Sequence, residues 1–268
     1  MHPLLTTAVK AARRAGTVIV RHLDQLDRIT VTQKARNDYV SSVDRLAEQH
    51  IIDILRSAYP GHSILAEETG RHKGNEYEWI IDPLDGTTNF IHGYPQFAVS
   101  IALRRGTVIE HGVVFDPLRN ELFTTSRGAG AYLNDRRVRV SNVSRLRDAL
   151  LGTGFPFRMI EDLDIWLSTF RALLPRSSGV RRAGSAALDL AYVANGRFDG
   201  FWEMGLNEWD MAAGVLLVRE AGGLVTDLQG GQTHLETGNI LAANPDILPV
   251  MLELIRPRLT RQRLQAGK

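Results

Sequence analysis

Two aspartates lie three positions apart in the segment DPLDGTTNF at residues 82–90, where Asp82 and Asp85 are followed by a glycine and two threonines. Asp, Pro and Gly all favour turns, so a solvent-facing loop is one interpretation. Carboxylates held close together repel one another, and a divalent cation removes that repulsion. Ligand sets made only of oxygen favour Mg²⁺ or Mn²⁺. The pattern therefore indicates a candidate metal site that handles phosphate.

Further oxygen ligands lie near the ends of predicted strands. Glu67 and Glu68 end the strand SILAEE, and we expect Asp82 to end the strand EWIID. The Leu84 carbonyl could supply another oxygen. Two ions about 3.5–4 Å apart, bridged by a shared carboxylate, have a geometry suited to in-line phosphoryl displacement.

The residues after Asp85 suit phosphate. If GTTNF opens a helical turn, its first backbone N–H groups are unpaired and can bind a phosphate. Gly86 has no Cβ and so permits close approach, and the Thr87 hydroxyl can orient a water molecule. Placed after apolar strands, this arrangement favours the metal site over the solvent-facing loop.

Two other phosphate-handling motifs are excluded. The letters LDGTT resemble the Asp-X-Asp-Gly-Thr signature of haloacid-dehalogenase phosphatases, but the position of the nucleophilic aspartate is Pro83, which cannot attack phosphorus. The sequence also contains no Gly-x-x-x-x-Gly-Lys-Ser/Thr segment. A nucleotide-triphosphate site of the P-loop type is therefore absent.

Composition narrows the remaining classes. The 268 residues carry a formal net charge of +2, so nothing in the charge demands nucleic acid. The chain has no cysteine, which excludes disulfides and thiolate chemistry and suits a cytoplasmic location. No apolar run reaches the length of a membrane span, and Lys10, Arg13 and Arg14 interrupt any signal peptide. The basic tail at 256–268 predicts a solvated end or, alternatively, a docking surface for an acidic partner.

Periodicity predicts an α+β fold with mixed sheets, divided at residues 1–144 and 145–268. Helices are expected from Pro3 to about His22 and at 42–58, with Ser42 as N-cap. Short connections after residue 97 predict an antiparallel meander. Beyond residue 145 strands are expected near 149–153, 199–203, 223–227 and 239–243, and helices near 161–174, 185–195, 209–221 and 245–256. The apolar face of the helix at 42–58 comprises Val43, Leu46, Ala47, His50, Ile51, Ile54, Leu55 and Ala58.

The segment DPLDGTTNF, together with WDMAAGVLLVREAGG at 209–223 and LAEE at 65–68, resembles the inositol monophosphatase family along essentially the whole chain, and most closely its bacterial SuhB-type branch. The resemblance implies a layered α/β/α/β/α sandwich of the inositol monophosphatase and sugar phosphatase type. It implies hydrolysis of inositol monophosphates with two or three Mg²⁺ ions, with Mn²⁺ as a substitute and Li⁺ as an inhibitor. It also implies a homodimer, and a second role in ribosomal RNA transcription antitermination with NusA and RNA polymerase.

The resemblance assigns roles to residues as well. Those it implies as metal ligands are Glu67, Asp82, the Leu84 carbonyl, Asp85 and Asp210. Those it implies as catalytic are Thr87 and Asp44, which position the attacking water, and Glu67. Those it implies as substrate-binding are Gly86, Thr87, Glu203, Gly184, Ser185, Ala186 and Asp210, of which Glu203 hydrogen-bonds an inositol hydroxyl. Lys34 matches a lysine in a mobile loop near a third metal.

Simpler interpretations stay open for several of these residues. Asp210 and Asp44 could each serve only the amino end of a helix. Glu203 could be an exposed turn residue, and Lys34 part of an ordinary polar loop. Related phosphatases act on fructose 1,6-bisphosphate, 3′-phosphoadenosine 5′-phosphate or histidinol phosphate, and a regulatory binding protein with incidental catalysis is the alternative from another class.

Overall fold

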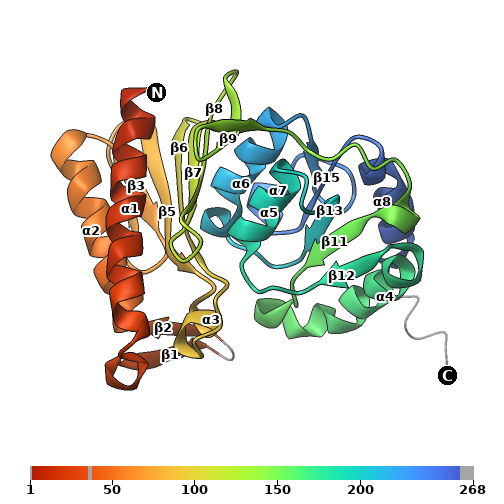
Figure 1. Ribbon diagram of the computed structural model, residues 1–268, viewed down its shortest axis with the longest axis horizontal. Helices are drawn as coiled ribbons and strands as arrows, with labels where there is room; N and C mark the ends of the chain where they lie inside the picture. The colour runs from red at the N-terminus through yellow and green to blue at the C-terminus, as the bar shows by residue number, and fades with distance from the viewer. Residues whose placement is uncertain (1, 36–37, 260–268) are drawn as a thin grey trace.

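Helices and sheets alternate in five layers in the computed structural model, which describes residues 2–35 and 38–259 (Figure 1). Helices α1 (Pro3–Leu23) and α2 (Ser42–Ala58) cover the outer face of a first sheet, and α5 (Ala186–Ala194) and α6 (Glu208–Glu220) lie between that sheet and a second one. Helices α4 (Leu163–Leu173) and α8 (Ile247–Ile255) cover the far face of the second sheet. The predicted α+β layered fold is confirmed.

The first sheet has the strand order β10-β9-β8-β7-β6-β5-β3-β4. Its strands from β5 onward pair with their sequence neighbours in antiparallel fashion, which confirms the predicted meander, whereas β3 and β5 are parallel. The strands are β3 (Ser63–Ala66), β4 (Gly70–His72), β5 (Tyr77–Asp85), β6 (Ala98–Arg105), β7 (Val108–Asp116), β8 (Glu121–Ser126), β9 (Gly130–Leu133) and β10 (Arg136–Val138).

The second sheet is mixed, with the order β12-β11-β13-β15-β14. Strand β11 pairs in parallel with both neighbours, and β15 pairs antiparallel with both of its own. The strands are β11 (Leu150–Thr153), β12 (Gly179–Arg181), β13 (Gly200–Glu203), β14 (Leu224–Thr226) and β15 (Ile240–Ala243). Only β12 was not predicted among them.

Smaller elements complete the chain. A two-stranded hairpin and the short helix α3 lie together below the first sheet in Figure 1. The hairpin strands are β1 (Val31–Ala35) and β2 (Asp38–Ser41), and the short helices are α3 (Thr87–Ile91) and α7 (His234–Thr237). Turns of 3₁₀ helix lie at Leu26–Arg28, Leu146–Asp148, Phe157–Asp162, Leu174–Arg176 and Arg256–Arg258.

The apolar run EWII in β5 is explained by burial on both faces of the first sheet. Trp79 and Ile81 pack toward α1 and α2, while Ile80 between them packs toward α5 and α6. Successive side chains of a strand point to opposite faces, so a strand covered on both sides reads as a continuous apolar run rather than an alternation.

The two middle helices are buried along most of their length because sheets cover them on both sides. Every residue of α5 is buried, and so are residues 210–218 of α6. Small residues let the two helices approach closely, and a Cβ placed on Gly214 would lie 2.6 Å from the Cβ of Leu190. Helices α5 and α6 belong to the later part of the sequence but pack on the first sheet, which is formed by the earlier part. The predicted division of the chain into residues 1–144 and 145–268 stays a prediction.

Helix α2 differs from its prediction in two respects. Its N-cap is Ser41 rather than Ser42, because the Ser41 hydroxyl accepts hydrogen bonds from the Val43 and Asp44 amides. Leu46, expected on the apolar face, is 41% exposed. The buried face instead includes Asp44 and Glu48, whose hydrogen-bond partners lie on the side of the first sheet. Polar partners, not hydrophobicity alone, decide which stripe of this helix is buried.

No helix in the described part of the chain combines the length and the apolar character that a bilayer-spanning segment requires.

Candidate active site

Strand β5 does not end at Asp82 as expected but continues irregularly to Asp85. Its pairing with β6 shifts between these two residues. Pro83 has no N–H to donate to a neighbouring strand. The next amide, that of Leu84, donates instead to Asp82 Oδ1 at 3.0 Å. The irregular stretch therefore brings two carboxylates that a regular strand would hold farther apart to one end of the sheet.

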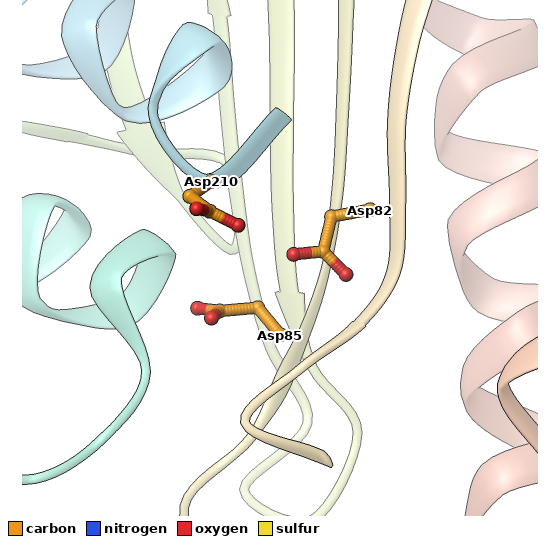
Figure 2. Close-up of side chains that lie close together, drawn as sticks. All are labelled: Asp82, Asp85 and Asp210. Carbon is orange, nitrogen blue, oxygen red and sulfur yellow. The ribbon is translucent and has the colours of Figure 1, made fainter. Parts of the chain in front are cut away.

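Three carboxylates converge at this end of the sheet. Asp82, Asp85 and Asp210 each place an oxygen within 4.8 Å of the others, and Figure 2 shows their side chains turned toward one common space. Asp82 and Asp85 come from β5 and Asp210 comes from the first turn of α6. Asp82 and Asp210 are buried. Residues far apart in the sequence thus form one acidic cluster.

The electrostatics of the cluster show how costly it is without a cation. Burial raises the pKa of Asp82 well above its usual value, and the charges of Glu67, Asp85 and Asp210 raise it further. Glu67 directly follows β3 and lines the same cavity. The cluster consists of carboxylates, and Leu84 lines the cavity with them. This all-oxygen ligand set fits Mg²⁺ or Mn²⁺.

Helix α5 holds Asp85 in place. Asp85 Oδ2 accepts hydrogen bonds from the Ser185 hydroxyl at 2.6 Å and from the Ala187 amide at 2.8 Å. Ser185 is the N-cap of α5 and is fully buried. Gly184, Ser185 and Ala186 line the cavity, in agreement with the expected position of this segment. The contact of Ser185 with Asp85 was not foreseen.

Asp210 is both a helix cap and a member of the cluster. Its Oδ2 accepts a hydrogen bond from the Asn207 amide at 2.7 Å, within a capping box at the start of α6. The neighbouring Glu208 forms an ion pair with Arg104 on β6, which also pairs with Glu78 on β5. Asp210 therefore does cap its helix, and this role does not exclude its membership of the acidic cluster.

Asp44 and Thr87 form the expected pair. The Thr87 hydroxyl lies 2.8 Å from Asp44 Oδ1 and 3.1 Å from the Leu84 carbonyl oxygen. The other carboxylate oxygen of Asp44 accepts the Ser41 amide at 2.8 Å, so Asp44 also caps its helix. Burial raises the pKa of Asp44 to about 6, and hydrogen bonds from Ser41 and Thr87 oppose that shift.

The helical turn predicted after Asp85 is present as α3, with Gly86 as its N-cap at φ +97°. A Cβ at Gly86 would lie 2.8 Å from the Gln96 carbonyl oxygen, so only glycine fits without strain. Asn89 follows in the same helix, and its Nδ2 lies 2.7 Å from the Gln96 oxygen and 2.9 Å from the Ala183 oxygen. The binding of phosphate by the first amides of α3 stays a prediction.

A cavity of about 350 Å³ extends from the carboxylates to a second, less acidic end. There the Arg182 guanidinium lies over the Phe155 ring, 4.6 Å from its centre. Glu203, at the end of β13, also lines the cavity, and a methyl group on Gly154 would overlap its carboxylate. Burial lowers the pKa of Arg182, and the charge of Glu203 opposes this. Glu203 therefore lies in the cavity rather than on an exposed turn.

Several cavity residues were not predicted. Asn89 stands inside the DPLDGTTNF segment, and Arg182 lies two positions before Gly184, so proximity to these predicted site residues could have indicated both. Nothing in the sequence indicated Tyr39 or Phe155. Lys34 belongs to β1, but its side chain falls outside the described part of the structure, as do the tail residues after 259.

Comparisons with known proteins agree with this architecture. The Nus factor SuhB of Pseudomonas aeruginosa is 56% identical over 265 residues, which cover 97% of this chain and 98% of that protein. The crystal structure of extragenic suppressor protein suhB from Bartonella henselae matches with a TM-score of 0.93 at 46% identity, covering 95% and 99% of the two chains. Inositol monophosphatase from Anabaena (Nostoc) sp. PCC 7120 matches with a TM-score of 0.84 at 42% identity, covering 94% and 95%.

A family model, which compares sequences alone, also matches this chain. The inositol monophosphatase family model matches residues 1–262, which include both sheets and all three acids of the cluster. Because the match spans the chain and relatives exceed 50% identity over nearly their whole length, this chain belongs to the inositol monophosphatase family.

Proposed function

We propose that this protein hydrolyses phosphate monoesters of the inositol monophosphate class with bound Mg²⁺. The observation that carries the proposal is the convergence of Asp82, Asp85 and Asp210 in one buried cluster beside a cavity. Membership of a phosphatase family supports the reaction class. The ligand roles of Glu67 and the Leu84 carbonyl are part of the same proposal.

When bound, Mg²⁺ supplies an activated water and neutralises negative charge on the phosphate and the departing oxygen. The chain's own residues orient the reactants. The Thr87 hydroxyl donates its proton in a hydrogen bond to Asp44. The Thr87 oxygen is therefore left to accept a hydrogen bond from the attacking water. Asp44, with its raised pKa, is suited to receive a proton through Thr87. The amides of Gly86 and Thr87 bind the non-bridging phosphate oxygens.

The far end of the cavity selects the alcohol that carries the phosphate. Glu203 accepts a hydrogen bond from a polyol hydroxyl, and its charge disfavours a second phosphate at that position. We therefore expect the site to prefer inositol monophosphates as substrates to fructose 1,6-bisphosphate and 3′-phosphoadenosine 5′-phosphate. Gly184 and Ala186 line the cavity between the two ends and leave room for a ring.

The test is release of inorganic phosphate from a panel of these esters, with and without Mg²⁺. We expect release from inositol 1-phosphate that depends on Mg²⁺, is partly supported by Mn²⁺ and is inhibited by Li⁺. Asp85→Asn should abolish it. Full Mg²⁺-dependent release by that variant would refute the proposal, and a preference for a bisphosphate would refute the substrate assignment alone.

A second role is favoured by the relatives, which carry the name Nus factor SuhB. We propose that the chain also joins a transcription antitermination complex with NusA, RNA polymerase and ribosomal RNA, and that it works as a cytoplasmic homodimer. Capture of these partners from lysate by both the wild type and Asp85→Asn would show that this role is separable from catalysis. Absence of capture across a range of salt concentrations would argue against it.

A further inference from the structure

The turn that carries Glu67 is held by hydrogen bonds from three successive amides. It connects β3 and β4, whose ends Ala66 and Gly70 pair with one another. The Glu67 amide donates to the Ile81 carbonyl on β5 at 3.2 Å. The next two amides, those of Glu68 and Thr69, donate to a side chain outside the sheet.

Those two amides are bound by one buried side chain of α2. Glu48 Oε2 accepts from the Glu68 amide at 2.8 Å, and Glu48 Oε1 accepts from the Thr69 amide at 2.9 Å. Glu48 is 1% exposed. A buried carboxylate costs free energy unless it is hydrogen-bonded, and two backbone N–H donors offset that cost.

The position of Glu48 on its helix links this turn to the rest of the site. Glu48 lies four residues after Asp44, so the two carboxylates project from the same face of α2. Asp44 contacts Thr87, and Glu48 contacts the turn after Glu67. One helix, which itself contributes no member of the acidic cluster, therefore contacts both segments that flank it.

We propose that Glu48 is a positioning residue that fixes Glu67 against Asp82 and thereby sets the metal affinity of the site. The inference rests on the proposed function only in taking Glu67 as a ligand. Burial raises the pKa of Glu48, and the hydrogen bond from the Glu68 amide opposes this shift. Without both acceptor oxygens the Glu68 and Thr69 amides would lose their hydrogen bonds to α2, and Glu67 would no longer keep a single position.

The variant that tests this is Glu48→Gln, which keeps the size of the side chain but replaces one acceptor oxygen by an NH₂ group that cannot accept. We expect Mg²⁺ binding measured by calorimetry to weaken about 10- to 100-fold. Saturating Mg²⁺ should restore most of kcat. Glu48→Asp, which keeps the charge on a shorter side chain, should weaken binding less and covers the case in which Glu48→Gln folds poorly.

The matched control is Leu55→Ala, which removes a fully buried side chain from the same helix two turns farther along. It should lower the melting temperature while leaving Mg²⁺ affinity within about twofold, because leucine has no group that could hydrogen-bond the turn. Hydrogen exchange provides a second measurement. In Glu48→Gln the Glu68 and Thr69 amides should exchange faster with solvent than in the wild type. In Leu55→Ala their exchange rates should change only as much as the loss of global stability requires.

The outcomes separate this inference from the proposed function. If Glu48→Gln lowers the melting temperature like the control but binds Mg²⁺ as the wild type does, Glu48 is only structural and the inference is wrong. If the wild type binds Mg²⁺ yet releases phosphate from no ester, the proposed function is wrong, while the change in Mg²⁺ affinity still decides the role of Glu48. A wild type that binds no Mg²⁺ would overturn both.

Discussion

The two ends of the cavity are built differently. At the acidic end, side chains are fixed by hydrogen bonds, as Asp85 is by α5 and Asp210 by its own capping box. At the other end, the Arg182 guanidinium lies over the Phe155 ring, the charge of Glu203 acts on Arg182, and Gly154 leaves space for the Glu203 carboxylate. Phe155 is 37% exposed. The first end gathers like charges, whereas the second, the shape-selecting end, combines an acid, a base and an aromatic ring.

This difference predicts how substitutions divide between chemistry and selectivity. Groups that hold a metal must keep their geometry to within a fraction of an ångström, so each lost hydrogen bond should lower the rate or the metal affinity. A shape-selecting end tolerates change, and substitutions there should alter which ester is preferred. The following four predictions test this division.

The largest effect is expected for Asp85→Asn at the acidic end. The substitution removes a negative charge from the cluster while keeping the size of the side chain. We expect kcat for phosphate release to fall about 1,000-fold, equivalent to about 4 kcal/mol. Steady-state kinetics at saturating Mg²⁺ would measure it. A loss that excess Mg²⁺ fully reversed would show that the charge acts on metal binding alone.

Asp44→Asn should lower activity and make the stability of the protein less dependent on pH. We expect kcat to fall about 100-fold, because proton transfer through Thr87 is lost. The folded-state pKa of Asp44 is about 6 and its usual value is 3.8, so the folded state binds the proton more tightly. The stability that this carboxyl contributes is complete below its usual pKa and is lost as pH rises through about 6.

In Mg²⁺-free buffer, the stability of Asp44→Asn relative to the wild type should therefore rise by up to about 3 kcal/mol as the pH increases from about 4 to about 7.5. A constant loss is added to this change, because the NH₂ group of Asn cannot accept the hydrogen bonds that one Asp44 oxygen accepts. Urea unfolding across this pH range measures both parts, and Thr87→Ser, which retains the hydroxyl, is the control for activity. A stability difference that does not change with pH would contradict the prediction.

Ser185→Ala, also at the acidic end, should have a smaller effect on catalysis. It removes one of two hydrogen bonds to Asp85 and leaves the Ala187 amide in place. We expect the Mg²⁺ concentration for half-maximal activity to rise about tenfold, with kcat nearly unchanged at saturation. Ser178→Ala, at an exposed serine outside the cavity, provides the control. Equal effects of the two substitutions would rule out positioning by Ser185.

The smallest effect is expected at the shape-selecting end, for Gly154→Ala. The added methyl group would displace the Glu203 carboxylate, which lies at the end of a flexible side chain. We expect KM for inositol 1-phosphate to rise about fivefold, or about 1 kcal/mol, with Mg²⁺ dependence unchanged. In a Glu203→Ala background the same substitution should have no further effect. Additive losses would mean that Gly154 acts by another route.

Local patterns predicted much of this arrangement. The strand and helix alternation, the meander and the turn after Asp85 follow from periodicity and turn chemistry within short windows. The DPLDGTTNF segment was identified for the same reason, since its two carboxylates are close in sequence. The convergence of Asp210 with Asp82 required the family resemblance, because they stand more than a hundred residues apart and no spacing relates them.

The unpredicted features depend on contacts between distant segments. Ser185 donates to a carboxylate a hundred positions earlier, and Glu48 accepts from amides twenty positions later. On a helical pattern Glu48 reads as a solvent-facing charge, and Leu46 reads as buried, because hydrophobicity carries no information about a partner elsewhere in the chain. Similarly, the predicted end of β5 was wrong because the Leu84 amide donates to the Asp82 side chain, and strand prediction considers only hydrogen bonds between backbones.

The close approach of α5 and α6 has a consequence for the spacing of the acids. Helix α5 holds Asp85 through its first turn, and α6 carries Asp210 in its own first turn. One turn farther along, Gly214 faces Leu190 with no room for a methyl group. A single hydrogen atom in place of a side chain thus lets the helix that holds Asp85 and the helix that carries Asp210 lie close together, so a residue outside the cavity lining contributes to the placement of two carboxylates within it.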